Sequence, residues 1–254
     1  MTDTTTDTID RLAGLAQGNP SFTTRHEREK VALATQACED LLLGSQLDSA
    51  LTQAERLVLA AEQARVSGVA ALEADYRARA EALSDAITPE LRTILEQPDA
   101  QTGNARMDAM LHFVRTLALN PAESDQAALL AIPAAGLSLN DTVLLAQLIG
   151  FVAYQARLLV GVKAMSDMGG VDYAPAAEPA ATAPFVHPAN LPPPGEPLRR
   201  NGFTSETLDW KAWLEVLSPD TTTPEQQHVL EVSHPKAKTM DFYLLLARQP
   251  QVLL

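Results

Sequence analysis

The chain has 254 residues, of which 46% are hydrophobic and 20% are charged, and its formal net charge is -13. This acidic balance argues against nucleic acid as a partner, because phosphate binding requires a basic surface. A single cysteine excludes an intrachain disulfide and favours a cytoplasmic location. Aromatic residues make up only 5%, while alanine and leucine are abundant, so the composition favours helices over sheets.

Helical periodicity predicts a succession of helices in the first half of the chain. Thr52 and Glu55 have the spacing of a capping box at the start of one helix, and Pro89 stands at the first position of another. Gly44 is placed as a C-cap. The expected helices cover residues 8–15, 24–43, 52–66, 69–83, 105–119 and 123–131, with a shorter one from residue 88.

Residues 137–165 form the most apolar stretch, and we expect the chain to be organised around them as one long helix. Ser138 would cap this helix, with Asp141 reaching back to the cap amide in a short-armed capping box. A helix that is apolar on nearly every side lies in a protein core or spans a membrane. Arg157 and two glutamines interrupt the run, which favours a soluble all-α core over a membrane span.

Part of this helix repeats an earlier pattern. Residues 51–60 align with residues 137–146 at an offset of 86, and each copy has an N-cap, a carboxylate three residues later and an apolar helix. The two copies indicate either a duplicated unit in a pseudo-symmetric bundle or two buried helices with the same start signal. We expect Leu148 and Val152 to be fully buried where the two units meet.

The last third of the chain has a different composition. Residues 169–201 contain eight prolines and predict an extended linker between a domain at 1–168 and a segment at 202–254. We expect an apolar helical patch around Trp210, Trp213, Leu214 and Leu217, then helices over residues 223–232 and 238–252. The final helix stops in mid-pattern, which favours a fragment of a longer protein. Its apolar face predicts a homo-oligomer with contacts after Gly202.

The long helix resembles the signature helix of the alkylhydroperoxidase-D (AhpD) and carboxymuconolactone decarboxylase (CMD) superfamily. That signature has a capped start, an acidic residue, an apolar run, then Cys-x-Tyr-Cys with a histidine one turn later. The corresponding residues here are Val152-Ala153-Tyr154-Gln155, and Leu159 takes the place of the histidine. The tyrosine is kept, whereas both cysteines are replaced. Gln155 in an apolar stripe would need hydrogen-bond partners.

A second resemblance lies after the linker and extends the first over most of residues 30–254. The stretches GFTSETLDWKAWLEVL, TPEQQHVLEV and MDFYLLLARQPQVLL resemble the lead-in of the peroxidase-related branch, in which a Cys-x-x-Cys helix follows. The resemblance therefore implies an AhpD-like helical bundle with a degenerate first unit and the start of an active second one. It implies a non-catalytic scaffold or oligomerisation unit of an antioxidant protein.

The alternative is an active enzyme of the same family. It would reduce alkyl hydroperoxides through Cys38, or act as a cysteine-free decarboxylase or isomerase with His112, Arg115 and Arg157 around a carboxylate substrate. Cys38 lies on an apolar helix face, which is also typical of an unreactive core cysteine. Glu225, His228 and Glu231 have metal-ligand spacing but occur only once, which favours a solvated helix face. We expect no metal and no cofactor.

Overall fold

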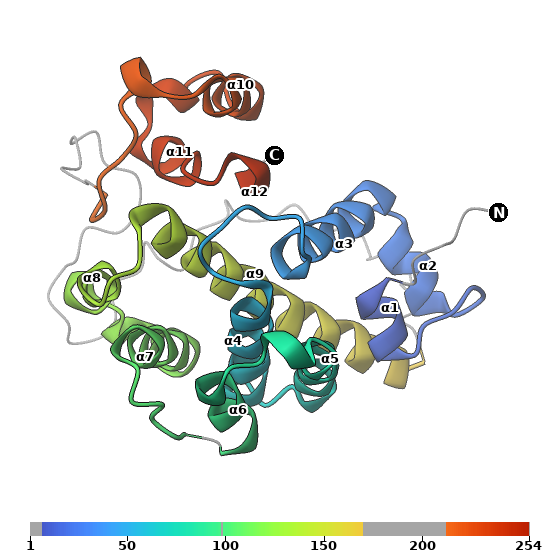
Figure 1. Ribbon diagram of the computed structural model, residues 1–254. Coiled ribbons are helices and arrows are strands. Elements are labelled where there is room, and N and C mark those ends of the chain that lie inside the picture. The colour runs from blue at the N-terminus through green and yellow to red at the C-terminus, as the bar shows by residue number, and fades with distance from the viewer. Residues whose placement is uncertain (1–6, 98, 170–211, 254) are drawn as a thin grey trace, which may run out of the picture. The chain divides into compact units, whose positions relative to one another are not determined.

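The computed structural model describes residues 7–97, 99–169 and 212–253, and the regular structure in these ranges is helical, without a strand (Figure 1). The expected all-α class is confirmed. Nine α-helices lie in the first two ranges: α1 Thr8–Ala13, α2 Pro20–His26, α3 Glu29–Leu43, α4 Gln53–Val66, α5 Ala70–Glu81, α6 Pro89–Glu96, α7 Ala105–Leu119, α8 Gln126–Ala134 and α9 Leu139–Asp167. The third range holds α10 Pro224–Ser233, α11 Asp241–Leu246 and α12 Pro250–Leu253.

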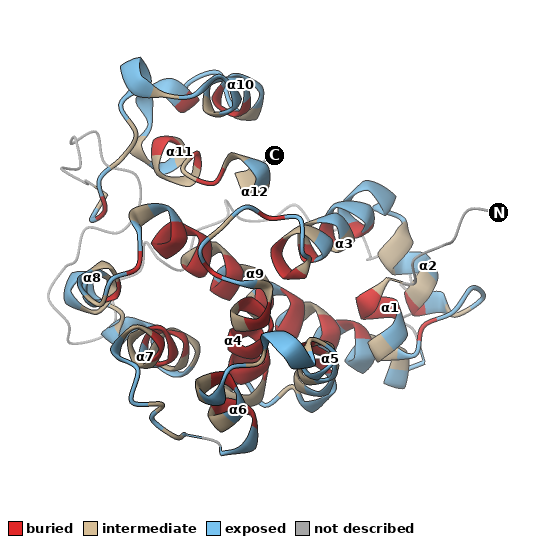
Figure 2. Ribbon diagram, in the orientation of Figure 1, coloured by how far each residue is buried: buried red, intermediate tan, exposed pale blue. Residues whose placement is uncertain are grey.

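The most enclosed element of residues 7–169 is α4, which packs against α3, α5, α6, α7 and α9 (Figure 1). Ten of its fourteen residues are buried. In α9, by contrast, twelve of 29 residues are buried, and eight of these precede Ala153. Figure 2 shows this change from a buried to a largely exposed helix along α9. The expectation that the long helix is enclosed on nearly every side therefore holds only for its N-terminal half.

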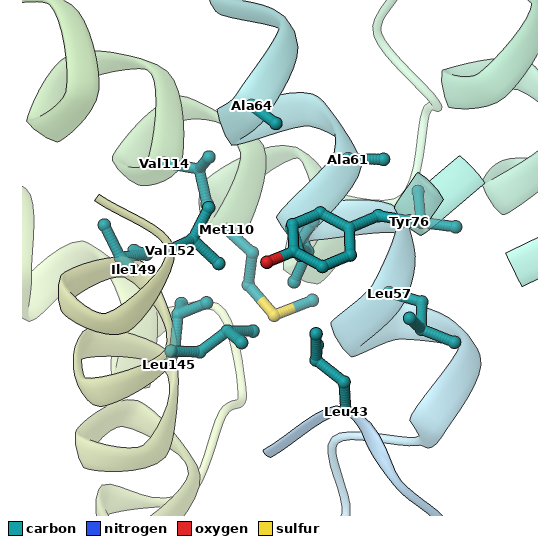
Figure 3. Packing of buried hydrophobic residues seen from close by; sticks show 14 of the residues in the cluster. Leu43, Leu57, Ala61, Ala64, Tyr76, Met110, Val114, Leu145, Ile149 and Val152 are labelled. Carbon is teal, nitrogen blue, oxygen red and sulfur yellow. The ribbon is translucent and has the colours of Figure 1, made fainter. Parts of the chain in front are cut away.

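The core between α4 and α9 is closely packed, and Figure 3 shows Leu145, Ile149 and Val152 of α9 facing Met110 and the Tyr76 ring. The predicted burial of Leu148 and Val152 is confirmed, with exposed fractions of 1% and 0%.

The two helices of the predicted internal repeat cross each other. The side-chain amide of Gln63 on α4 donates to the carbonyl oxygen of Ile149 on α9 at 2.7 Å, and these positions are 86 residues apart. This separation equals the offset of the sequence alignment, so equivalent positions of the two copies meet at the crossing. A pseudo-twofold axis that relates the two copies would bring equivalent positions together in the same way.

The two helix starts differ in detail. Thr52 and Glu55 form the predicted reciprocal capping box. Asp141 does not reach the amide of Ser138; its carboxylate instead accepts from the hydroxyls of Ser138 at 2.6 Å and Ser49 at 2.7 Å. The aspartate side chain is one methylene shorter than glutamate, which explains why the expected short-armed box does not form.

The link from α3 to α4 depends on two residues. Gly44 is the C-cap of α3 as predicted, and this position requires glycine because a Cβ there would lie only 2.1 Å from the carbonyl oxygen of Asp40. The buried Arg56 of α4 donates to the carbonyl oxygens of Leu42, Gly44 and Leu51. A guanidinium thus satisfies carbonyls at the C-terminus of α3 that have no partner within the helix.

Several predicted boundaries in this part are wrong. Asn19 and Pro20 begin α2 as N-cap and first helical residue, in the stretch between the helices that we expected at residues 8–15 and 24–43. The chain leaves helical geometry at Arg28, where α3 starts anew. The helix expected at residues 123–131 is instead α8, which Asp125 caps and which extends to Ala134 with Pro133 inside it.

Residues 212–253 have a small core of their own, composed of Val229, Leu230, Ala237, Leu244 and Ala247. The helix predicted around the tryptophans is not formed over residues 212–218, and Trp213 is 50% exposed. The helix predicted at 238–252 is divided into α11 and α12, because Pro250 lacks an amide and starts a new helix. Trp210 and the predicted linker after Gly169 lie outside the described residues.

Candidate functional site

Gln155, which the sequence resemblance aligns with the second cysteine of the family signature, is the centre of a buried polar network. The Gln155 side chain is completely buried. Its amide nitrogen donates to Glu39 Oε2 at 2.5 Å, and its carbonyl oxygen accepts from the Tyr76 hydroxyl. Both ends of the amide are therefore bound, which meets the requirement for partners that its place in an apolar stripe predicts.

Glu39 is the only charged group of this network that is almost fully enclosed, with 1% exposed. Its second carboxylate oxygen, Oε1, accepts from the Thr8 hydroxyl at 3.0 Å and from Arg79 at 2.5 Å. The network thus joins α1, α3, α5 and α9 through four side chains around one carboxylate. The positive charge of Arg79 and the three donors compensate for the loss of hydration on burial.

Tyr76 closes the network on the side of the apolar core. Figure 3 shows its hydroxyl directed toward α9, while its ring packs against Met110. Burial, reinforced by the nearby negative charge of Glu39, raises the pKa of Tyr76 well above its ordinary value. The phenol therefore stays protonated and serves as a hydrogen-bond donor to Gln155. This arrangement suits a structural network and offers no ionised nucleophile.

Val152 and Gln155, which the resemblance aligns with the two family cysteines, are one turn apart on α9 and both are fully buried. Neither side chain presents a reactive atom, and no exposed surface leads from solvent to either one, since both have an exposed fraction of 0%. Tyr154, which the resemblance aligns with the family tyrosine, is 43% exposed and hydrogen-bonds to Thr35 of α3 at 3.1 Å.

Cys38 precedes Glu39 on α3 and is partly buried. Burial raises the pKa of its thiol, and the negative charge of Glu39 raises it further. A raised pKa lowers the thiolate fraction at neutral pH, and the thiolate is the form that attacks peroxides. The environment of Cys38 is therefore the opposite of that of an activated cysteine.

The three residues suggested for a decarboxylase have separate surroundings. His112 is exposed on α7. Arg115 donates to Glu62 at 2.5 Å. Burial raises the pKa of Glu62, but hydrogen bonds from Arg65 and Arg115 outweigh this effect and lower the pKa overall. Arg157 is exposed on α9 and donates to the carbonyl oxygen of Ala153 in its own helix at 2.9 Å.

The possible metal ligands on α10 are all exposed. Glu231 pairs with Lys238 at 2.8 Å, and this ion pair and hydrogen bond lower the pKa of its carboxylate. Within the described ranges, no group of three or more His, Cys, Asp or Glu side chains is placed to hold a metal ion.

Sequence reasoning missed Glu39 and Tyr76 as the partners of Gln155. It also missed Thr8 and Arg79, which bind Glu39. The available signal was Glu39 itself, a carboxylate within the apolar run of α3 directly after Cys38. A carboxylate at such a position is buried only when it is paired, so its presence predicts a partner but does not identify one.

No family model, curated protein or solved structure matches this chain. Among the described helices, α9 alone has the length and composition to cross a bilayer, and half of its most apolar window is buried within the fold.

Proposed function

We propose that this chain is a non-catalytic member of the AhpD and CMD superfamily that acts as a scaffold or oligomerisation unit of an antioxidant, peroxidase-related protein. The observation that supports this proposal is the buried network at Gln155. The glutamine stands where the resemblance places a catalytic cysteine, and it holds four helices together instead. A position with a structural role of this kind can be retained after catalysis has been lost.

The environment of Cys38 also favours a non-catalytic role. A one-cysteine peroxidase would need a thiol with a lowered pKa, whereas burial and Glu39 raise the pKa of Cys38. The alternative, an enzyme that uses Cys38 or a cysteine-free decarboxylase, would have to operate without an activated thiol or a shared cluster of His112, Arg115 and Arg157.

We therefore expect no thiol-dependent peroxidase turnover above the uncatalysed rate. The measurement is consumption of hydrogen peroxide and of an organic hydroperoxide with a dithiol reductant. A Cys38→Ser variant is the matched control, because it removes the one thiol and retains the network at Gln155. Turnover by the native chain that the Cys38→Ser variant lacks would replace the scaffold proposal with the one-cysteine enzyme.

The oligomerisation role is supported by the apolar surface of residues 212–253. Four large hydrophobic side chains are at least 40% exposed on this short segment: Trp213, Val232, Met240 and Phe242. The segment already has a small core of its own. The exposed residues are therefore additional to those that hold it together, and exposed apolar groups at this density are typical of interaction surfaces.

We expect the full chain to form a homo-oligomer that a Trp213→Ser/Phe242→Ser variant dissociates. Light scattering at micromolar concentration gives the mass of each form. Leu33→Ser is the control, because Leu33 is 64% exposed on α3 and lies in a different segment. A native chain of monomer mass would contradict the oligomerisation role, as would equal dissociation by the control variant.

A further inference from the structure

A groove lies beside the exposed half of α9, where the turn between α4 and α5 and the end of α7 approach it. Its walls are apolar and come from Val69, Ala118, Ala156 and Val160, with Ser67 and Arg157 as polar residues. The cavity volume is about 450 Å³, which falls within the range of roughly 300–1,000 Å³ typical of small-molecule sites. Val160 is 55% exposed, so this apolar surface is open to solvent.

Arg157 is the single charged residue that lines the groove. Its guanidinium donates to the carbonyl oxygen of Ala153 in its own helix, and none of the ion pairs among the described residues includes it. Two arginines in the same part of the fold, Arg65 and Arg115, are both bound to Glu62. Arg157 therefore retains donors for an anion, and a guanidinium can bind a carboxylate through two parallel hydrogen bonds.

A second groove, on the opposite side of α9, provides a comparison. It is smaller, at about 220 Å³, and is lined by Arg25 and Arg28 together with Val31, Tyr154 and Leu158. Arg25 is already paired with Asp7 and Asp10 at 2.9 and 2.8 Å. Arg28 stands between Glu27 and Glu29 in the sequence. Neither groove is lined by a carboxylate, but ion pairs already neutralise Arg25 in this groove, whereas no ion pair among the described residues includes Arg157.

We propose that the Arg157 groove binds an organic monocarboxylate with a short or medium aliphatic chain. The carboxylate would pair with the guanidinium of Arg157, and the chain would cover the apolar surface of Val69, Ala118 and Val160. The charge complementarity is local, since the chain as a whole carries a net charge of -13. Selectivity for an aliphatic monocarboxylate therefore depends on the combination of one cation with an apolar wall. Neither the cation nor the apolar wall provides this selectivity alone. This proposal is independent of the loss of peroxidase catalysis.

The test is binding of octanoate to the full-length chain, measured by isothermal titration calorimetry and by chemical-shift changes of residues in the groove. Octanol supplies the same chain without charge, and acetate supplies the charge without the chain; both should bind more weakly than octanoate. Arg157→Gln should weaken octanoate binding by about tenfold or more, because a charge-assisted pair is lost. Arg28→Gln is the matched control and should leave octanoate binding unchanged.

A second variant addresses the apolar wall. Val160→Glu places a carboxylate at an exposed position and should abolish octanoate binding without affecting the helical circular dichroism spectrum. The proposal is wrong if octanoate does not bind, if octanol binds equally well, or if Arg157→Gln and Arg28→Gln have the same effect. If octanoate does not bind and Val160→Glu converts an oligomer into a monomer, the groove is a contact between subunits and not a ligand site.

Discussion

Glu39→Leu should lower the free energy of unfolding by about 3–5 kcal/mol, as expected when one partner of a buried charged network is removed. The substitution leaves the amide of Gln155 and the hydroxyl of Thr8 without their acceptor in a region from which water is excluded. Chemical denaturation followed by circular dichroism measures this loss. A domain of this kind has only about 5–15 kcal/mol of stability, so the variant should be close to unfolding at moderate temperature.

The neighbouring residue provides the control. Asp40 is exposed and its carboxylate accepts from Gln36 at 2.8 Å, so Asp40→Leu should change stability by less than about 1 kcal/mol. A Glu39→Leu/Gln155→Leu variant should lose less than the sum of its single substitutions, because no buried amide then remains beside an apolar side chain. Additive losses, or a Glu39→Leu variant as stable as Asp40→Leu, would contradict the proposed network.

Leu148→Ala should lower the free energy of unfolding by about 2–5 kcal/mol, the usual range for deletion of a large buried side chain. Leu148 is 1% exposed on the half of α9 that packs on α4. The measurement is the midpoint and slope of urea denaturation. The midpoint should fall while the slope is retained, since the surface exposed on unfolding is nearly the same in both proteins.

Leu33→Ala is the matched control for this substitution, because it deletes the same atoms from a leucine that is 64% exposed on α3. Its effect should lie within about 0.5 kcal/mol. A Leu148→Ala variant with a midpoint equal to that of Leu33→Ala would mean that the contact between α4 and α9 does not stabilise the fold.

The sequence predicted elements best where side-chain chemistry is local. Asn104 caps α7, whose observed bounds match the predicted residues 105–119, and Thr52 caps α4 through the predicted box. Errors arose where one signal has two meanings. Asn19-Pro20 can end one helix or begin the next, and here it begins α2. The apolar residues around Trp213 suggested a helix, but burial of Leu214 does not require helical backbone there.

The candidate site was predictable only in part, for a physical reason. An amide in an apolar stripe must be hydrogen-bonded, so the need of Gln155 for partners follows from the sequence alone. The identity of those partners does not, because Tyr76 and Glu39 are 79 and 116 residues away and no local pattern connects them. Likewise, the exposure of Arg157 follows from helical periodicity, whereas the groove beside it depends on where α7 and the turn after α4 lie.

The separation of 116 residues between Glu39 and Gln155 affects how the protein emerges from the ribosome. At about 5–20 residues per second, translation reaches Gln155 roughly 6–23 s after Glu39. During that interval Thr8 and Arg79 can bind one carboxylate oxygen of Glu39, but the other oxygen lacks the amide of Gln155 and keeps its contact with water. The first helices consequently cannot complete their core during synthesis, and α3 stays open until α9 has been made. Its apolar residues are available to chaperones, or to neighbouring nascent chains, for the whole of that time.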